Sequence, residues 1–302
     1  MNTQPLVSIA IPAYKAKHLA VAIRSVLQQS YRQLELIVVN DHSPENIDHV
    51  VEEFNDSRIR YYINSVNCGG KNPANNWNKC LSYAKGEFFA LLCDDDYYEP
   101  DFISEMLALA EKHPATNVFR SRADVVDSDG RQVDKYASSP EWESWDDYLW
   151  HVCRNYRTQT ISEWFFRTET LRQAGGYSLL PLAWYADYLS VFHFSVKGGI
   201  ASTSKILVHF RQSGENISSR NDANTIQKIE ATRQFRNAVS TLLNDNPNKP
   251  QLMLSLDKLL KMHLKYHLGF ASISVLFRIF LQRKQLGIKK SLLWHALWHK
   301  EK

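Results

Sequence analysis

The chain has 302 residues, a net charge of +4, 44% hydrophobic residues and 23% charged residues. This composition is typical of folded proteins and excludes a disordered, collagenous or low-complexity chain. The length suggests about two domains. No apolar run reaches the roughly 18 residues of a membrane span, and the N-terminal residues lack the features of a secretory signal, so we expect a cytoplasmic protein.

The cysteines and the charges are distributed unevenly along the chain. Cys68, Cys80, Cys93 and Cys153 lie far apart without the spacing of a zinc site, which predicts reduced thiols. Residues 258–302 contain ten Lys and Arg against the single acid Glu301, so the preceding part of the chain is net acidic. This asymmetry predicts a basic appendage that faces an anionic partner.

The first hundred residues alternate between two hydrophobic periodicities. Apolar runs predict strands at 6–12, 34–39, 58–63 and 88–92. Between and after them, helices are expected at 18–29, near 45–54, at 73–84 and at 101–112. Strands that alternate with helices indicate βαβ units, so we predict an α/β fold with a mostly parallel, mixed sheet flanked by helices.

The pattern changes in the second half of the chain. Residues 117–133 predict strands around a turn at 128–130, and another strand is expected at 204–210. Beyond residue 224 the periodicity is only helical. We therefore predict a catalytic α/β domain over residues 1–220 and a basic, amphipathic helical region over residues 221–302.

Three consecutive carboxylates follow the fourth predicted strand, at Asp94, Asp95 and Asp96. Ligands of open α/β sheets bind at the carboxyl ends of the strands. Adjacent carboxylates repel one another, and a hard divalent cation such as Mg²⁺ or Mn²⁺ would compensate them. The alternative is a solvated acidic turn that caps the helix expected at 101.

Five segments in order resemble the inverting glycosyltransferases of family 2. They are VSIAIPAYK at 7–15, LELIVVNDHSPEN at 34–46, the long stretch at 67–102 that includes the three aspartates, residues 175–199, and VHFRQSGENISS at 208–219. Several positions depart from the family pattern. Cys93 replaces an aspartate, Ala186 a glutamate and Ser213 a histidine, and further departures are Lys15, Asn40, His42 and Trp77. The resemblance implies the GT-A nucleotide-diphospho-sugar transferase fold with a C-terminal helical extension.

The resemblance also implies roles at the reacting end of the site. Asp187 would be the general base for the acceptor hydroxyl, the alternative being a cap for the helix that follows it. Asp96 would contact Mn²⁺ or Mg²⁺, with Asp94 as the second aspartate of the metal motif and Asp95 beside them holding water or sugar hydroxyls. His209 is a further candidate ligand, the alternative being a structural histidine.

The donor-binding residues come from the same resemblance. Asp41 would accept a hydrogen bond from the N3–H group of uracil or thymine, which favours a UDP-sugar. Arg211 has the geometry to bind phosphate oxygens. The remaining candidates are Pro12, Ala13 and Tyr14 as walls for base and ribose, and Asn78 at a family position.

The C-terminal region predicts a surface for a partner. Leucines recur at helical spacing at 252–260 and 292–297, with lysines and tryptophans beside the second group. One hypothesis is peripheral docking on the anionic inner face of the cell membrane, where a lipid-linked acceptor would be found. The alternative is a helical cap or a homodimer contact, and the absence of a recognisable module argues against nucleic acid.

The resemblance, together with the carboxylates, implies a metal-dependent inverting glycosyltransferase. By the same resemblance it would move a sugar from a nucleotide-diphosphate donor, with a UDP-sugar favoured, to a hydroxyl of a glycan or lipid-linked acceptor, in the synthesis of a surface polysaccharide. One alternative is an inactive protein that binds nucleotide-sugars as a scaffold. Another is a nucleotidyltransferase, although the loop after the first strand lacks the glycines typical of that class.

Overall fold

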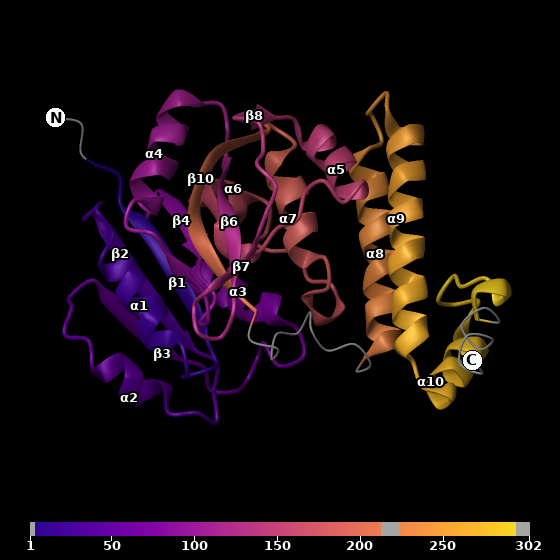
Figure 1. Cartoon of the computed structure of the whole chain (residues 1–302), viewed down its shortest axis with the longest axis horizontal. Coiled ribbons are helices and arrows are strands. Elements are labelled where there is room, and N and C mark those ends of the chain that lie inside the picture. The colour runs from indigo at the N-terminus through magenta and orange to yellow at the C-terminus, as the bar shows by residue number, and fades with distance from the viewer. Residues whose placement is uncertain (1–3, 213–223, 294–302) are drawn as a thin grey trace.

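The computed structural model describes residues 4–212 and 224–293. They form one wide sheet flanked by helices, with a pair of long helices standing beside it (Figure 1). Along the sheet the strands are ordered β3-β2-β1-β4-β9-β6-β10-β5, with β7 paired to β6 and β8 paired to β10.

The N-terminal half has the predicted alternation of strands and helices. Strands β1 (Val7–Ala13), β2 (Leu34–Asn40), β3 (Ile59–Ile63) and β4 (Phe88–Leu91) are joined by helices α1 (Leu19–Leu27), α2 (Ile47–Glu52) and α3 (Pro73–Tyr83). All four strands run parallel. Every residue of β2 and β4 is buried, as expected where helices cover both faces of a parallel sheet.

The second half makes the sheet mixed. Strand β9 (Trp164–Arg167) lies antiparallel between β4 and β6 (Val118–Val126), and β10 (Ile200–Arg211) runs parallel to β6. The short strands β5 (Tyr97–Tyr98), β7 (Gln132–Lys135) and β8 (Trp142–Glu143) pair antiparallel at the margins. The mixed sheet is confirmed, but the parallel pairing dominates only in its first half.

The second half of the chain contains further helices between and after these strands. They are α4 (Phe102–Lys112), α5 (Trp145–Cys153), η1 (Ile161–Glu163), α6 (Thr168–Gln173), η2 (Pro181–Ala183) and α7 (Ala186–Ser195). The C-terminal helices are α8 (Thr225–Leu242), α9 (Lys249–Phe270) and α10 (Ile273–Gln282). Within the described residues, no helix has the length and apolarity needed to cross a membrane.

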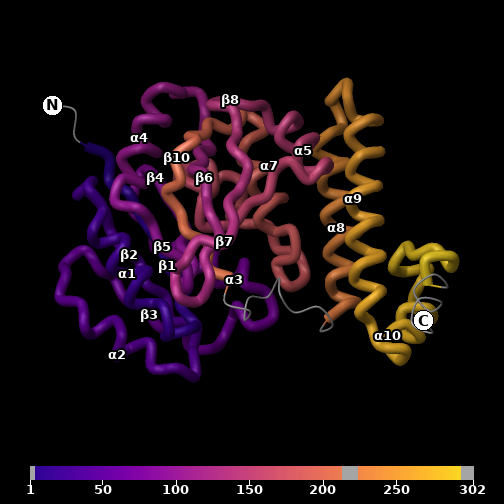
Figure 2. The backbone as a smooth tube through the Cα atoms, in the orientation of Figure 1, coloured from indigo at the N-terminus to yellow at the C-terminus, as the bar shows by residue number. Residues whose placement is uncertain are grey.

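Helices α8 and α9 share a hydrophobic core with the α/β part. They run side by side next to α5 and α7 (Figure 2), and Phe192 of α7, Phe235 of α8 and Leu256 of α9 belong to one buried cluster. Leu276 and Ile279 of α10 belong to a separate cluster at the end of α9. The expected boundary at residue 220 and the tail from residue 294 lie outside the described residues.

We expect His267 on α9 to make the stability of the fold depend on pH. It is 5% exposed, and its Nδ1 atom has no hydrogen-bond partner among the described residues. Burial, and then the neighbouring charges of Lys228 and His263, lower its pKa to about 4. Below the ordinary pKa of histidine the unfolded chain therefore binds a proton that the folded chain does not, and stability falls.

We expect His267→Leu to reduce this acid sensitivity. Between pH 7.5 and pH 5 the wild type should lose about 1–2 kcal/mol more unfolding free energy than the variant, because leucine binds no proton. Urea unfolding at the two pH values measures the difference. His49→Gln, at an exposed histidine of α2, is the matched control and should follow the wild type; parallel pH curves for wild type and His267→Leu would contradict the prediction.

Candidate active site

The three carboxylates after β4 are buried, and two of them are held by different parts of the chain. Asp94 Oδ2 accepts hydrogen bonds from the backbone N–H groups of Tyr14 and Lys15, both at 2.7 Å. Asp96 accepts one from the Ser162 hydroxyl at 2.5 Å and one from the Arg211 backbone N–H at 2.9 Å. The acidic segment thereby ties β4 to the ends of β1 and β10 and to η1.

Asp95 and Asp96 form a candidate metal site. Their carboxylate oxygens and the Cys93 sulfur lie within 4.8 Å of one another. Burial, and then the neighbouring Asp95, raise the pKa of Asp96 well above its usual value, a cost that a bound cation would relieve. Burial also raises the pKa of the Cys93 thiol, which keeps its proton at neutral pH, so the two carboxylates supply the oxygen ligands that Mg²⁺ or Mn²⁺ prefers.

Asp94 lies outside this group. Its carboxylate faces the two backbone donors that follow β1, and burial, together with Asp95, raises its pKa to about 6. We therefore take Asp95, and not the Asp94 of the sequence motif, as the candidate partner of Asp96 for a cation. Lys15 Nζ lies 3.3 Å from the Asp95 carboxylate and partly balances the local charge.

His209 is also separate from the carboxylate pair. Its Nδ1 atom lies 2.7 Å from Asp124 Oδ1 and its Nε2 atom 2.9 Å from Glu99 Oε1. The imidazole ring stacks on Tyr97, with 4.3 Å between ring centroids. With both nitrogens engaged by other carboxylates, His209 fits the structural alternative better than the role of a metal ligand.

The Arg211 side chain donates hydrogen bonds to backbone carbonyl oxygens, one of them in the acidic segment 94–96. Its Nε donates to the Asp95 carbonyl oxygen at 2.9 Å, and Nη1 donates to the carbonyl oxygens of Asp127 and Ser128, both at 3.0 Å. The residue is 4% exposed. These contacts make Arg211 a clamp between the Asp95 backbone and the β6–β7 turn.

Asp41 anchors the loop between β3 and α3. Its carboxylate accepts from the backbone N–H groups of Cys68 at 3.0 Å and Gly69 at 2.7 Å, and from the Asn64 side chain at 2.7 Å. A Cβ atom at residue 69 would lie 2.6 Å from Asp41 Oδ2, so this approach requires glycine. The Cys68 thiol also donates to Oδ1 at 3.1 Å, so among the described residues three donors reach Oδ1 and only the Gly69 N–H group reaches Oδ2. Each carboxylate oxygen has about two lone-pair sites, so Oδ2 keeps the capacity to accept one further bond from a base.

The other donor-binding candidates occupy two places. Pro12 and Ala13 end β1, with Ala13 fully buried, and Tyr14 beside them is 40% exposed. Asn78 on α3 exchanges two hydrogen bonds with the Tyr177 backbone, at 2.7 and 3.0 Å. Asn78 therefore joins α3 to the segment before η2, whereas Tyr14 is open to a ligand.

Asp187 lies in the first turn of α7 and is held by a residue that the sequence analysis did not identify. Gln159 Nε2 donates to Asp187 Oδ2 at 3.1 Å, and the Tyr148 hydroxyl donates to Gln159 Oε1 at 2.7 Å. Burial raises the pKa of Asp187, and the Gln159 hydrogen bond opposes that rise. A carboxylate with a raised pKa that is fixed by one amide has the properties of a general base.

The backbone before Asp187 is strained. Leu182, Ala183 and Tyr185 have φ values of 60°, 53° and 64°, in the left-handed region that L-residues rarely adopt. The Tyr185 hydroxyl lies 2.6 Å from His263 Nδ1 of α9, so the C-terminal helices help to hold this turn.

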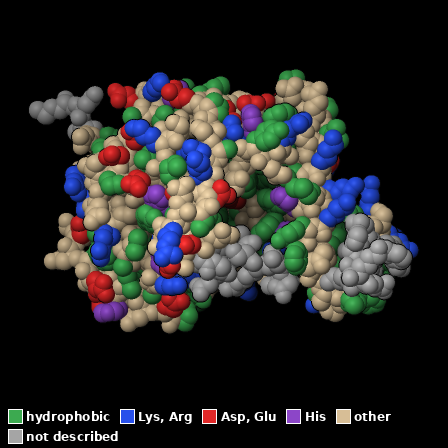
Figure 3. All heavy atoms as spheres, viewed as in Figure 1, with side chains coloured by type: hydrophobic (Ala, Val, Ile, Leu, Met, Phe, Trp, Pro, Cys, Tyr) green, Lys and Arg blue, Asp and Glu red, His purple; other side chains and the backbone are tan. Residues whose placement is uncertain are grey.

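Figure 3 shows the surface hollowed between the sheet and the C-terminal helices, with hydrophobic and histidine side chains along the hollow.

The sequence of the chain is similar to those of known glycosyltransferases. The family model of glycosyl transferase family 2 matches residues 8–172. The UDP-Glc:alpha-D-GlcNAc-diphosphoundecaprenol beta-1,3-glucosyltransferase WfgD of Escherichia coli is 38% identical over 109 residues, which are 36% of this chain and 42% of that enzyme. The putative teichuronic acid biosynthesis glycosyltransferase TuaG of Bacillus subtilis is 30% identical over 151 residues, 49% of this chain and 58% of that protein.

Solved structures show the same fold. S. aureus TarS in complex with UDP-GlcNAc aligns with a TM-score of 0.67 and 20% identity over 88% of this chain and 73% of that chain. The mannosyltransferase PcManGT from Pyrobaculum calidifontis, in complex with GDP-Man and Mn²⁺, aligns with a TM-score of 0.58 and 13% identity, over 98% and 84%. The predicted GT-A-like fold with C-terminal helices is confirmed, and the chain belongs to glycosyltransferase family 2.

Proposed function

We propose that this glycosyltransferase moves a sugar from UDP to a hydroxyl of a glycan or lipid-linked acceptor, with inversion at the anomeric carbon, in the synthesis of a surface polysaccharide. The observation that carries the proposal is the pair of buried carboxylates Asp95 and Asp96 at the carboxyl end of β4. Asp187 with Gln159 supplies the second component, a positioned base. The chain matches only part of the length of the curated relatives, so their own activities support the proposal by similarity alone.

The choice of donor and metal has separate support. The names of WfgD and of the TarS complex contain UDP-sugars, and Asp41 has the acceptor capacity for a uracil N3–H. Bound at Asp95 and Asp96, Mn²⁺ or Mg²⁺ would neutralise charge on the leaving diphosphate. Lys15, beside Asp95, would add a positive charge at the same place.

Asp187 would accept the proton of the acceptor hydroxyl. The acceptor oxygen would form a bond to the anomeric carbon while the bond from that carbon to the diphosphate breaks, and the diphosphate would leave with the electron pair. Gln159 would hold Asp187 Oδ2 in place, and the Tyr148 hydroxyl would fix the orientation of the Gln159 amide.

A nucleotide titration tests the donor and metal together. We expect UDP with Mn²⁺ to raise the apparent melting temperature more than GDP, dTDP or CDP, because a ligand that binds only the folded state stabilises it. Asp96→Asn should abolish the part of the shift that depends on Mn²⁺. Asp129→Asn, at an exposed aspartate, should keep it. A UDP shift that is the same with and without Mn²⁺ would contradict the metal dependence.

The pH dependence of UDP release from UDP-glucose or UDP-N-acetylglucosamine tests the base. Asp187→Asn should lower kcat by about 10²–10⁴-fold. Gln159→Leu removes a hydrogen bond to the charged carboxylate, so the pKa of Asp187 should rise and the acid limb of kcat/KM should move to higher pH by up to about one unit. Gln159→Glu would not restore the hydrogen bond to Asp187, because an ionised glutamate has no proton to donate at neutral pH. An unmoved acid limb in Gln159→Leu would contradict the role of Asp187 as the base. Nucleotide binding without UDP release in the wild type would favour the scaffold alternative.

Helix α10 supports peripheral docking on an anionic membrane. Ile273, Phe277 and Leu281 recur every four residues and are 69%, 62% and 64% exposed, which places an apolar stripe on one helix face. In and after this helix, the exposed basic residues up to residue 293 are Arg278, Lys284, Lys289 and Lys290. An apolar stripe with basic neighbours is typical of helices that lie in a membrane interface, and each basic residue near an anionic surface contributes about 1 kcal/mol.

Flotation with vesicles tests this docking on the full chain. We expect binding to phosphatidylglycerol vesicles and much weaker binding to phosphatidylcholine vesicles, because the basic residues need anionic lipid. The triple variant with serine at 273, 277 and 281 should lose at least tenfold in vesicle affinity. Val66→Ser, at an apolar residue of similar exposure in the α/β part, is the control. Equal flotation of the wild type and the triple variant would exclude α10 as the docking surface.

A further inference from the structure

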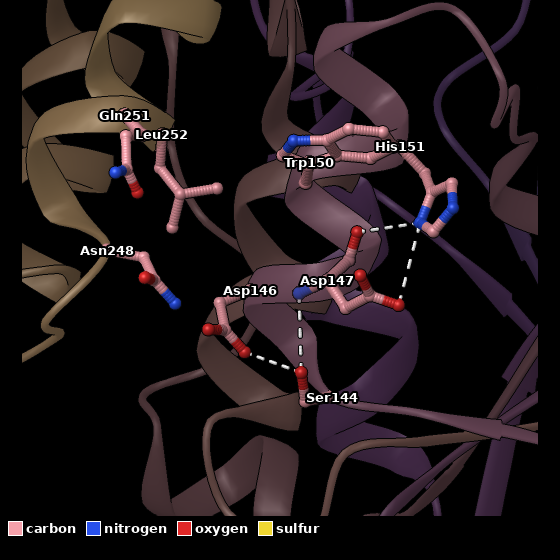
Figure 4. Close-up of a pocket in the computed structure, with 8 residues that line it drawn as sticks. All are labelled: Ser144, Asp146, Asp147, Trp150, His151, Asn248, Gln251 and Leu252. Atoms are coloured by element: carbon pink, nitrogen blue, oxygen red, sulfur yellow. Dashed lines mark hydrogen bonds and ion pairs between the residues drawn. The ribbon is translucent and has the colours of Figure 1, made fainter.

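A cavity of about 570 Å³ lies between α5 and the start of α9, apart from the carboxylate pair and Asp187. Figure 4 shows Trp150 and Asp146 on the α5 side and Asn248, Gln251 and Leu252 on the α9 side, with space between them. The complete lining is Ser144, Asp146, Asp147, Trp150, His151, Asn248, Gln251 and Leu252. The volume is in the usual range of small-ligand sites.

The side chains that line the cavity favour one chemical class of ligand. Asp146 and Asp147 contribute carboxylates, and none of the eight described lining residues is Lys or Arg. This disfavours phosphates and other anions, including the diphosphate of a sugar nucleotide. The side chains of Asn248 and Gln251 are exposed, and their planar amides offer both donors and acceptors. A neutral ligand with many hydroxyl groups fits this set.

Hydrogen bonds restrain the Asp146 side chain, and a cation–π contact restrains the Trp150 side chain. Asp146 Oδ1 accepts from the Ser144 hydroxyl at 2.5 Å and Oδ2 accepts from the Asn246 amide at 2.9 Å, so this carboxylate connects α5 with the turn before α9. The Arg154 guanidinium lies 4.3 Å from the centre of the Trp150 ring and restrains the indole that lines the cavity. Restrained partners lose less conformational freedom when a ligand binds.

We propose that this cavity binds a neutral sugar unit of the glycan that the enzyme extends. The C–H face of a pyranose would pack on the Trp150 indole, whose π face is negative. Its hydroxyls would donate to Asp146 and Asp147 and exchange hydrogen bonds with the Gln251 amide. The identification of the ligand as part of an acceptor or product glycan rests on the proposed function; the cavity and its chemistry do not.

The cavity is connected to the proposed base through α5. Trp150 lines the cavity from this helix, and Tyr148 of the same helix donates its hydroxyl proton to Gln159, which holds Asp187. A sugar unit bound at Trp150 would therefore rest on the element that positions the base.

Saturation-transfer NMR on the full chain tests the site. The probes are the methyl glycosides of glucose, galactose, mannose, rhamnose and N-acetylglucosamine, with laminaritriose and chitotriose, in the presence of saturating UDP and Mn²⁺. We expect transfer to at least one probe, at least fivefold weaker in Trp150→Ala and also weaker in Gln251→Ala. Trp142→Ala is the matched control, because Trp142 is 49% exposed and does not line the cavity.

Gln251→Ala alters an exposed side chain and keeps the test valid if Trp150→Ala does not fold. Transfer to no probe, or transfer that persists in both cavity variants, would overturn the proposal. Transfer lost in Asp187→Asn but kept in Trp150→Ala would also overturn it, because the sugar would then occupy the catalytic site. Stabilisation by UDP is read separately, so sugar binding without any nucleotide binding would contradict the proposed function and leave this site standing.

Discussion

The structure depends on the burial of consecutive carboxylates at the end of β4. Desolvation and mutual repulsion oppose this burial, so each carboxylate needs partners from elsewhere in the chain. Asp94 takes the backbone N–H groups that follow β1, and Asp96 takes the Ser162 hydroxyl and the N–H group at the end of β10. The hydrogen bonds that compensate the burial of these carboxylates therefore also fix the relative positions of the ends of β1, β4 and β10.

The segment 158–163 connects the two halves of the site. It carries Ser162, which holds Asp96, and Gln159, which holds Asp187. It is itself fixed by the ion pair between Arg120 Nε and Glu163 Oε1 at 2.7 Å, with side chains only 3% and 0% exposed. Loss of one partner of a buried pair leaves an uncompensated charge, which typically costs about 3–5 kcal/mol. This ion pair thus supports both the proposed metal ligand Asp96 and the proposed base Asp187.

The sequence predicted most of the first half of the fold because helix and strand periodicities alternate there and the strands are paired in a simple order. It also singled out the three carboxylates and Asp187 as candidate site residues. It did not identify β9, Gln159 or Ser162, since the aromatic region that contains them has no clear period. Nor does sequence distinguish Asp94 from Asp95, because their difference arises from backbone donors about eighty residues away. Such partners are set by tertiary packing alone.

The basic C-terminal region was predicted as a separate unit, but its helices divide between two roles. Helices α8 and α9 belong to the main core, and α9 provides His263, whose contact with the Tyr185 hydroxyl supports the strained turn before Asp187. Helix α10 packs in a separate cluster and presents its apolar stripe outward. Truncation within α9 would therefore disturb the proposed base as well as any membrane contact. Among the described residues, substitutions on the outer face of α10 would separate the proposed attachment from the proposed catalysis.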